Sequence, residues 1–214
     1  MSGTFDRVAG IGVVPVIAIE KAEYAVPLAD ALLEGGLGVA EITFRTAAAA
    51  EVMAILRDKR PELLTGAGTI LTLDQVASAA GCGAAFGLAP GFDPAIVDAA
   101  AGAGLPFAPG VMTPSDLTLA AGRGCRLMKF FPAVAAGGPV MLKNIHAPFA
   151  HLGLRFIPTG GVTLETMKDW LAMPEIAAVG GTWIAKAEDM RNGDWSGIAA
   201  KARAAVARAK EIRG

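Results

Sequence analysis

The stretch Leu127-Met128-Lys129-Phe130-Phe131-Pro132 is a short apolar run with a single lysine inside it. Glycines bound the run at Gly124 and at Gly137-Gly138, which favours a buried strand. An ammonium group among such neighbours is poorly solvated, so its neutral amine form becomes available as a nucleophile. Taken alone, the run allows a second interpretation, in which Lys129 extends from a strand end into water.

Similar apolar runs alternate with longer amphipathic or alanine-rich segments throughout the chain. The candidate strands cover residues 13–19, 39–44, 63–67, 84–88, 105–108, 127–131, 154–158 and 176–179. Glycine or proline ends the helical segments between them, for example 22–34, 47–60 and 163–172. Strands and helices that alternate in this way pair in parallel, and eight such units close into a (β/α)8 TIM barrel with a parallel eight-stranded sheet.

An open doubly wound sheet is the alternative fold for the same alternation. It lacks the support of a Gly-x-Gly-x-x-Gly motif after the first run. Neither a linker nor a charge block divides the 214 residues, so we expect a single (β/α)8 barrel domain over residues 1–214. Hydrophobic residues make up 53% of the chain, which favours buried parallel strands, a subunit interface, or both.

Charge and hydropathy exclude several classes of partner. The formal net charge is -1, and the basic residues are scattered along helical segments such as 201–213, so no basic face is available for nucleic acid. The uncharged stretch 76–92 approaches the length of a membrane span, but glycines and a proline interrupt it. The apolar residues 8–19 imitate a signal peptide, yet they contain Pro15 and lack a convincing cleavage site. We expect a cytoplasmic protein with neither nucleic-acid nor membrane partners.

The cysteines and histidines do not form a recognisable ligand set. Cys82 and Cys125 stand far apart, which predicts two reduced thiols rather than a disulfide or a redox motif. His146 and His151 lack carboxylate or thiolate partners at ligand spacing. We therefore expect no metal and no cofactor.

Polar and glycine-rich positions gather at the ends of the candidate strands, where barrels place their chemistry. They are Glu41 and Arg45 in and after the second run, Thr69 after the third, Pro90 after the fourth, Lys129 in the sixth, Thr159, Gly160 and Gly161 after the seventh, and Gly180, Gly181 and Thr182 after the eighth. So many such strand ends are unlikely to arise by chance, and they predict a site at this end of the barrel.

Side chains alternate across a strand, so Glu41 and Arg45 share one face while Ile42 and Phe44 share the other. The apolar face should meet the helices, which leaves the carboxylate and the guanidinium pointing inward. They could form a purely structural ion pair. If Lys129 also points inward, its amine can add to a ketone and the Glu41 carboxylate can move protons. The Arg45 guanidinium can hold the carboxylate of the ligand. A 2-keto acid fits all three groups.

The glycine pairs Gly160-Gly161 and Gly180-Gly181 follow the last two runs. At this place barrels commonly bind phosphate through backbone N–H groups, and Thr182 could add a hydroxyl. Either pair alone could be a plain turn, but two pairs at this location favour phosphate. The expected partner is a small phosphorylated 2-keto acid.

Five segments resemble those of the bacterial 2-keto-3-deoxy-6-phosphogluconate (KDPG) aldolases, which also cleave 4-hydroxy-2-oxoglutarate (KHG). They are residues 41–46, 66–69, 89–91, 129–133 and 158–161. The resemblance runs in register from about residue 13 to residue 183. It implies a metal-free (β/α)8 class I aldolase, usually a homotrimer, that acts in the cytoplasm in the Entner-Doudoroff pathway of carbohydrate metabolism.

The resemblance also implies a role for each matching residue. Lys129 would be the Schiff-base lysine, Glu41 the acid/base glutamate and Arg45 the arginine that contacts the keto-acid end. The remaining matches are substrate-binding Thr69, Pro90, Phe131 and Thr159, and phosphate-binding Gly160, Gly161, Gly181 and Thr182. Two positions depart from the common pattern: Thr182 replaces a serine but keeps the hydroxyl, and Val134 replaces a polar residue with no consequence that the sequence predicts.

The expected reaction is cleavage of KDPG to pyruvate and glyceraldehyde 3-phosphate, together with cleavage of KHG to pyruvate and glyoxylate. A 2-keto-3-deoxy-6-phosphogalactonate aldolase, which acts on the C4 epimer, is one alternative, and Arg45-Thr46 argues against it. A phosphosugar isomerase or epimerase would use Glu41 without forming an imine. A phosphate-binding barrel without catalysis would bind ligand and not turn it over.

Overall fold

The structure is a computed structural model that describes residues 3–214, in which strands and helices alternate along the chain. In chain order its elements are α1 (Gly3–Ile11), β1 (Val13–Ile17), η1 (Ala22–Tyr24), α2 (Ala25–Glu34), β2 (Val39–Thr43), α3 (Ala49–Lys59), β3 (Leu64–Gly68), α4 (Leu73–Gly81), β4 (Phe86–Leu88), α5 (Pro94–Gly102), β5 (Phe107–Ala108), β6 (Gly110–Val111), α6 (Pro114–Gly122), β7 (Leu127–Phe130), α7 (Gly138–His146), η2 (Ala147–Leu152), β8 (Arg155–Pro158), α8 (Met167–Leu171), β9 (Val179–Gly181), α9 (Ala187–Arg191) and α10 (Trp195–Arg213). The alternation predicted from the sequence is confirmed.

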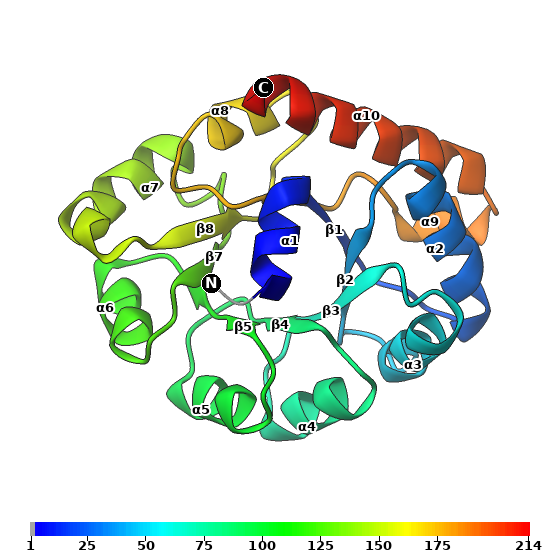
Figure 1. Ribbon diagram of the computed structural model, residues 1–214, viewed down its shortest axis with the longest axis horizontal. Coiled ribbons are helices and arrows are strands. Elements are labelled where there is room, and N and C mark those ends of the chain that lie inside the picture. The colour runs from blue at the N-terminus through cyan, green and yellow to red at the C-terminus, as the bar shows by residue number, and fades with distance from the viewer. Residues whose placement is uncertain (1–2) are drawn as a thin grey trace.

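The strands pair in parallel in two sheets, of order β5-β4-β3-β2-β1-β9 and β6-β7-β8. The order follows the chain and places the last strand beside the first, unlike the order of a doubly wound sheet, which reverses at a switch point. Only Pro109 separates β5 from β6, and isolated bridges join Phe156 to Ile176 and Thr159 to Gly180 on the other side. Figure 1 shows the strands surrounded by the helices, so the fold is α/β and TIM-like.

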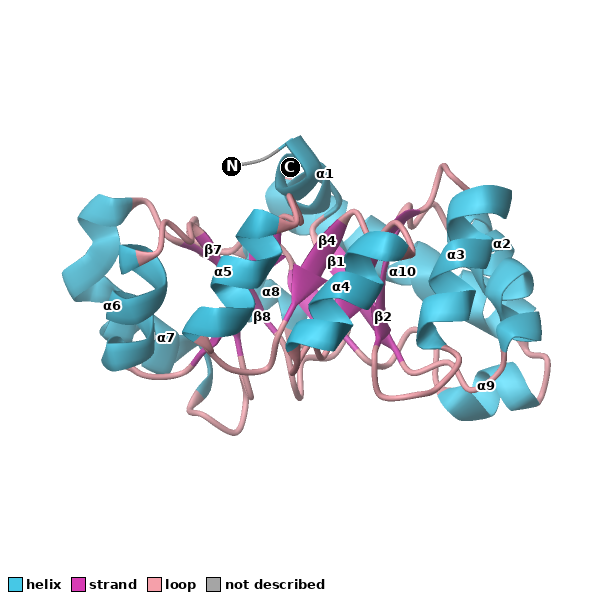
Figure 2. Cartoon of the chain, turned by 90° about the horizontal axis from the view of Figure 1, so that it is seen from below, coloured by secondary structure: helices cyan, strands magenta, loops and turns pink. Residues whose placement is uncertain are grey.

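Helix α1 lies over the amino ends of the strands. It occupies the centre of the view in Figure 1 and one edge of the strand layer in Figure 2. Its apolar side chains Phe5 and Val8 are buried, and the Phe5 ring lies 6.0 Å from that of Phe86, the first residue of β4. Burial of these side chains stabilises the closed amino end and leaves the carboxyl end for chemistry.

Several helices begin with a side chain that fixes the preceding loop. Thr72 accepts a hydrogen bond from the backbone of Gln75, and Asp93 accepts two at the start of α5. Thr113 and Asp116 form a reciprocal capping box at the start of α6. Such caps satisfy backbone N–H groups that a helix leaves unpaired, so the loops after β3, β4 and β6 are held in place.

Some predicted boundaries are wrong. The fifth strand, expected at 105–108, begins only at Phe107 as β5, and the unexpected strand β6 follows after Pro109, which has no N–H to donate. The eighth, expected at 176–179, begins at Val179. The helix expected at 163–172 shortens to α8 because Thr163 and Thr166 exchange side-chain and backbone hydrogen bonds in a turn.

Helix α1 was not expected from the sequence, since its residues merge into the apolar segment 8–19. Among the helices of residues 3–214, none combines the length and the apolar character that crossing a bilayer requires.

Arg213, near the end of α10, donates hydrogen bonds to the backbone carbonyls of Ala9, Ile176 and Ala177 and so ties three segments together. We expect Arg213→Met to lower the free energy of unfolding by about 2 kcal/mol, because charged donors make the stronger hydrogen bonds. Arg208→Met on the same helix is the control, since within residues 3–214 the Arg208 guanidinium hydrogen-bonds only to the exposed Glu211, and the change should cost less than about 0.5 kcal/mol. Denaturant unfolding measures both, and equal losses would contradict this role for Arg213.

Candidate active site

A buried ion pair between Lys129 and Glu41 lies within the ring of strands. Lys129 Nζ donates a hydrogen bond of 2.9 Å to Glu41 Oε1, and the two residues are only 4% and 1% exposed. Burying two charges is costly unless they compensate each other, and this contact supplies that compensation. Within residues 3–214, the other carboxylate oxygen, Oε2, is buried and accepts no hydrogen bond from the protein. It is therefore an acceptor available to a bound molecule.

The strand register places glycines beside Glu41 and so leaves space for this pair. Glu41 lies opposite Gly66 on β3, and Thr43 lies opposite Gly68. A Cβ atom on Gly68 would stand 2.1 Å from Glu41 Oε1 and 2.7 Å from its Cδ, far inside contact distance. The carboxylate thus occupies the space that a side chain at position 68 would fill, and Gly68 is a part of the site that the sequence analysis did not single out.

Arg45 lies beyond the end of β2 and is exposed. Its Nε donates a hydrogen bond of 3.3 Å to the hydroxyl of Thr43, which is itself buried. Glu41 pairs with Lys129 across the strands, and among the described residues it forms no ion pair with Arg45. The alternative of a structural Glu41–Arg45 ion pair is therefore wrong, and the guanidinium remains free of a carboxylate partner within the described chain.

The four residues expected to bind substrate all lie just after strands. The ring of Phe131 is centred 5.9 Å from Lys129 Nζ. Thr159 is buried after β8 and packs in the space left by Gly180 on β9. Thr69 follows β3 with a φ of 59°, a left-handed conformation that is uncommon for a β-branched residue. Pro90 follows β4 and lines a cavity of about 250 Å³ with Ile70 and Phe92.

The expected phosphate-binding residues lie on the loops after β8 and β9. Gly160 and Gly161 have φ values of 100° and 82°, which side chains rarely adopt. The backbone of Val134 donates to the Gly160 carbonyl at 3.0 Å, so the segment after Lys129 lies against this loop. Gly181 ends β9 and is buried, whereas Thr182 is exposed beside it. Successive backbone N–H groups in a tight turn can line a concavity that binds an anion.

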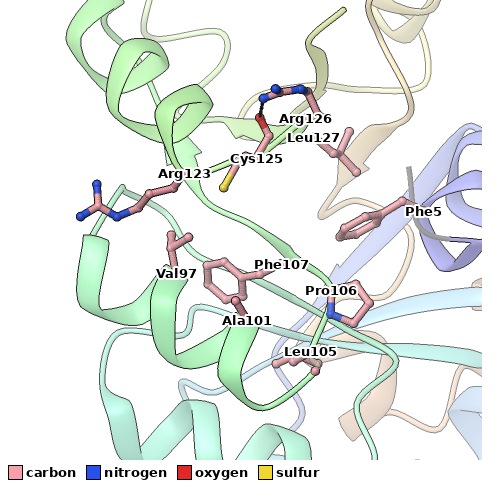
Figure 3. Close-up of a pocket in the computed structure, with 12 residues that line it drawn as sticks. Phe5, Val97, Ala101, Leu105, Pro106, Phe107, Arg123, Cys125, Arg126 and Leu127 are labelled. Carbon is pink, nitrogen blue, oxygen red and sulfur yellow. Dashed lines mark hydrogen bonds between the residues drawn. The ribbon is translucent and has the colours of Figure 1, made fainter.

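A cavity of about 390 Å³ opens at the opposite end of the strands (Figure 3). Its wall includes Phe5 of α1, Phe107 at the start of β5 and Leu127 at the start of β7. None of the expected site residues lines it. This cavity, whose wall also includes Arg123 and Arg126, belongs to the amino end of the strands and is separate from the Lys129–Glu41 pair.

The cysteines are free, and burial raises the pKa of both the Cys82 and the Cys125 thiol, which favours the uncharged form. His146 Nδ1 lies 3.8 Å from a carboxylate oxygen of Glu175, a neighbour that sequence spacing could not reveal. Over residues 3–214, no three histidine, cysteine or acidic side chains come together as a group that could hold a metal ion.

A lysine paired with a carboxylate on parallel strands can form an imine with a carbonyl compound and move the protons this requires. Comparison with known proteins gives this chemistry a family. The family described as KDPG and KHG aldolase matches residues 6–201. The 2-dehydro-3-deoxy-phosphogluconate aldolase of Haemophilus influenzae is 42% identical over 193 residues, 90% of each chain, and the KHG/KDPG aldolase of Escherichia coli is 40% identical over 198 residues, 92% of each chain.

A solved structure points the same way. KDPG aldolase from Legionella pneumophila, captured with pyruvate as a covalent carbinolamine intermediate, superposes with a TM-score of 0.89 at 38% identity and covers 94% of this chain and 97% of its own. The chain belongs to the KDPG and KHG aldolase family. The family and the lyase class expected from the sequence are confirmed.

Gly68→Ala tests whether the empty space beside Glu41 is required. The added Cβ would displace the carboxylate, and a misplacement of about 1 Å typically costs about 100-fold in rate, so we expect kcat/KM for KDPG to fall by at least that factor. Gly81→Ala is the control, because a Cβ there meets nothing within 4 Å and alanine favours a helix. Thermal unfolding of both variants would show whether the protein still folds. A folded Gly68→Ala protein with unchanged activity would contradict this account.

Proposed function

We propose that the protein is a class I aldolase that cleaves KDPG to pyruvate and glyceraldehyde 3-phosphate, with Lys129 as the Schiff-base residue. The observation that carries the proposal is the buried 2.9 Å contact between Lys129 and Glu41 in a chain of this aldolase family. A stable fold gains little from such a pair in its core, so its use lies in catalysis.

The contact supplies the first proton transfer. A proton passing from Lys129 Nζ to Glu41 leaves a neutral amine and a neutral carboxylic acid, both of which a buried site tolerates better than separate charges. The amine attacks C2 of the substrate, and one proton moves from its nitrogen to the C2 oxygen to give a carbinolamine. The Glu41 carboxylic acid then donates the second proton that this oxygen needs to leave as water. The product is an iminium ion between C2 and Lys129, with Glu41 as the carboxylate.

The iminium then accepts electrons from the bond that breaks. Glu41 removes the proton of the C4 hydroxyl, the C4–O bond becomes a carbonyl, and the electron pair of the C3–C4 bond moves toward the iminium nitrogen. Glyceraldehyde 3-phosphate leaves, and a pyruvate enamine remains on Lys129. Protonation at C3 by Glu41 and addition of water release pyruvate and restore the amine.

The ends of the substrate fit the groups around this centre. Arg45 lies past the end of β2 with its guanidinium free to hold the keto-acid carboxylate. Thr69, Pro90, Phe131 and Thr159 surround the reacting carbons, and the backbone of Gly160, Gly161 and Gly181 with the Thr182 hydroxyl binds the phosphate. The placement of these residues after strands, and the left-handed conformations of Gly160 and Gly161, support this assignment.

KHG is the second proposed substrate, since it shares the 2-keto acid that Lys129 and Arg45 address and the Escherichia coli relative is named for both activities. Arg45-Thr46 favours the gluconate over the galactonate substrate. A structure named native KDPGal is 24% identical with a TM-score of 0.84, which speaks for a shared fold alone.

The proposal extends to architecture and assembly. We take residues 1–214 as one domain whose two sheets, joined by the bridges at Phe156 and Thr159, act as one eight-stranded barrel. Exposed large apolar side chains on the loops and helices after β3 and β6, namely Leu71, Leu73, Met112 and Leu119, support a homotrimer. A cytoplasmic location fits a protein whose two cysteines are free thiols.

Borohydride reduction in the presence of pyruvate tests the imine. We expect a pyruvate adduct on Lys129, located by peptide mass mapping, because reduction converts the imine to a stable secondary amine. Lys129→Ala should give no adduct and no turnover, while the exposed Lys143 replaced by Ala should behave like the unsubstituted protein. A folded protein without an adduct would point instead to an isomerase, an epimerase or a barrel that only binds phosphate.

Thr182→Ala tests the phosphate loop. The variant loses a hydroxyl that is exposed beside Gly181, and one hydrogen bond to a charged group is worth about 2 kcal/mol. We expect KM for KDPG to rise roughly 10-fold or more, with kcat and the activity on unphosphorylated KHG nearly unchanged. Steady-state kinetics with both substrates measure this, and equal losses on both would place the phosphate elsewhere.

A further inference from the structure

Thr43 connects Arg45 to a neighbouring strand. Its hydroxyl accepts the Nε–H of Arg45 at 3.3 Å and donates its own proton to the carbonyl of Ile17, the last residue of β1, at 3.1 Å. The residue is 1% exposed. A hydroxyl has one proton to give, and because Ile17 receives it, the oxygen faces Arg45 as an acceptor.

Thr46 makes a similar contact without touching the guanidinium. Its hydroxyl donates to the carbonyl of Ile19 at 2.6 Å, so both threonines fasten the end of β2 to the chain leaving β1. They differ in one respect: only Thr43 receives a hydrogen bond from the Arg45 side chain. Replacing each threonine in turn therefore distinguishes a general effect on the loop after β2 from a specific effect on the Arg45 side chain.

We infer that Thr43 is a positioning residue, which orients the Arg45 guanidinium to receive the carboxylate of a 2-keto acid. The inference rests on the proposed function. Arg45 is exposed and long, and an arginine loses considerable rotamer freedom when it binds. By holding Nε, Thr43 leaves the two terminal NH2 groups for the ligand and removes part of that entropy loss before the substrate arrives.

This role predicts an effect on binding rather than on bond breaking. The carboxylate of the substrate lies away from C3 and C4 and keeps its charge throughout the reaction, so Arg45 holds ground state and transition state alike. Loss of such uniform binding raises KM and leaves kcat unchanged. A residue needed only for the stability of the barrel would not give this separation.

The test is a double-mutant cycle on the full chain with Thr43→Val, Arg45→Met and both together. We expect Thr43→Val to raise KM for KDPG and for KHG about fivefold, the size of one net hydrogen bond, with kcat within about twofold. In the Arg45→Met background the same change should have no further effect on KM, because the coupling partner is absent. Thr43→Ser should restore KM, and Thr46→Val, which loses a hydrogen bond that does not involve the guanidinium, should change KM by the same factor with and without Arg45.

If Thr43→Val raised KM equally with and without Arg45, the inference would be overturned and the aldolase assignment would stay intact. An unsubstituted protein that forms no pyruvate adduct on borohydride reduction would overturn the proposed function and the inference with it. If Thr43→Val does not fold, as thermal unfolding would show, Thr43→Ala takes its place in the cycle, with the same expected and contradicting outcomes.

Discussion

The contact between Lys129 and Glu41 constrains the whole carboxyl end of the strands. Neither charge is tolerable alone in so buried a place, so β2 and β7 must present them at hydrogen-bond distance although 88 residues separate them in the chain. Parallel pairing places both on one inner face, and Gly68 leaves the volume that the carboxylate needs. The site therefore depends on the glycine at position 68 as much as on the charged side chains of Lys129 and Glu41.

The sequence allowed the alternating architecture and most of the site to be predicted, because short apolar runs separated by capped helices admit few folds. Strand parity placed Glu41 on the inner face, but it left open whether Lys129 also points inward, which the structure shows. Parity could not tell which cation Glu41 pairs with, since that depends on where β2 ends, and the strand stops at Thr43 so that Arg45 lies outside it. Strand β6 was not predicted either, because the expected fifth strand ended at residue 108, before Pro109.

The two ends of the strands serve different purposes. At the amino end, α1 packs Phe5 against Phe86, and Arg213 joins α10 to the carbonyls of Ala9 and Ile176. The contacts there are apolar or directed at the backbone, as expected of a region that serves stability. The side chains that carry reactive groups, Glu41 on β2 and Lys129 on β7, meet toward the other end of the strands. The packing at the amino end stabilises the fold, so the carboxyl end can hold a buried ion pair and a left-handed residue such as Thr69.

Burial separates the two tasks of the proposed active site. Lys129 and Glu41 exchange protons in the proposed reaction, and a water-poor environment strengthens the interaction between them. Arg45 must bind a charged ligand that arrives from water, and the exposure of Arg45 keeps its guanidinium accessible to that ligand. An exposed arginine is mobile unless something holds it, and the Nε–H of Arg45 is held by the buried hydroxyl of Thr43, which Ile17 fixes in turn. The buried strands therefore orient the exposed Arg45 guanidinium through Thr43, a residue that carries no charge and takes no part in the reaction.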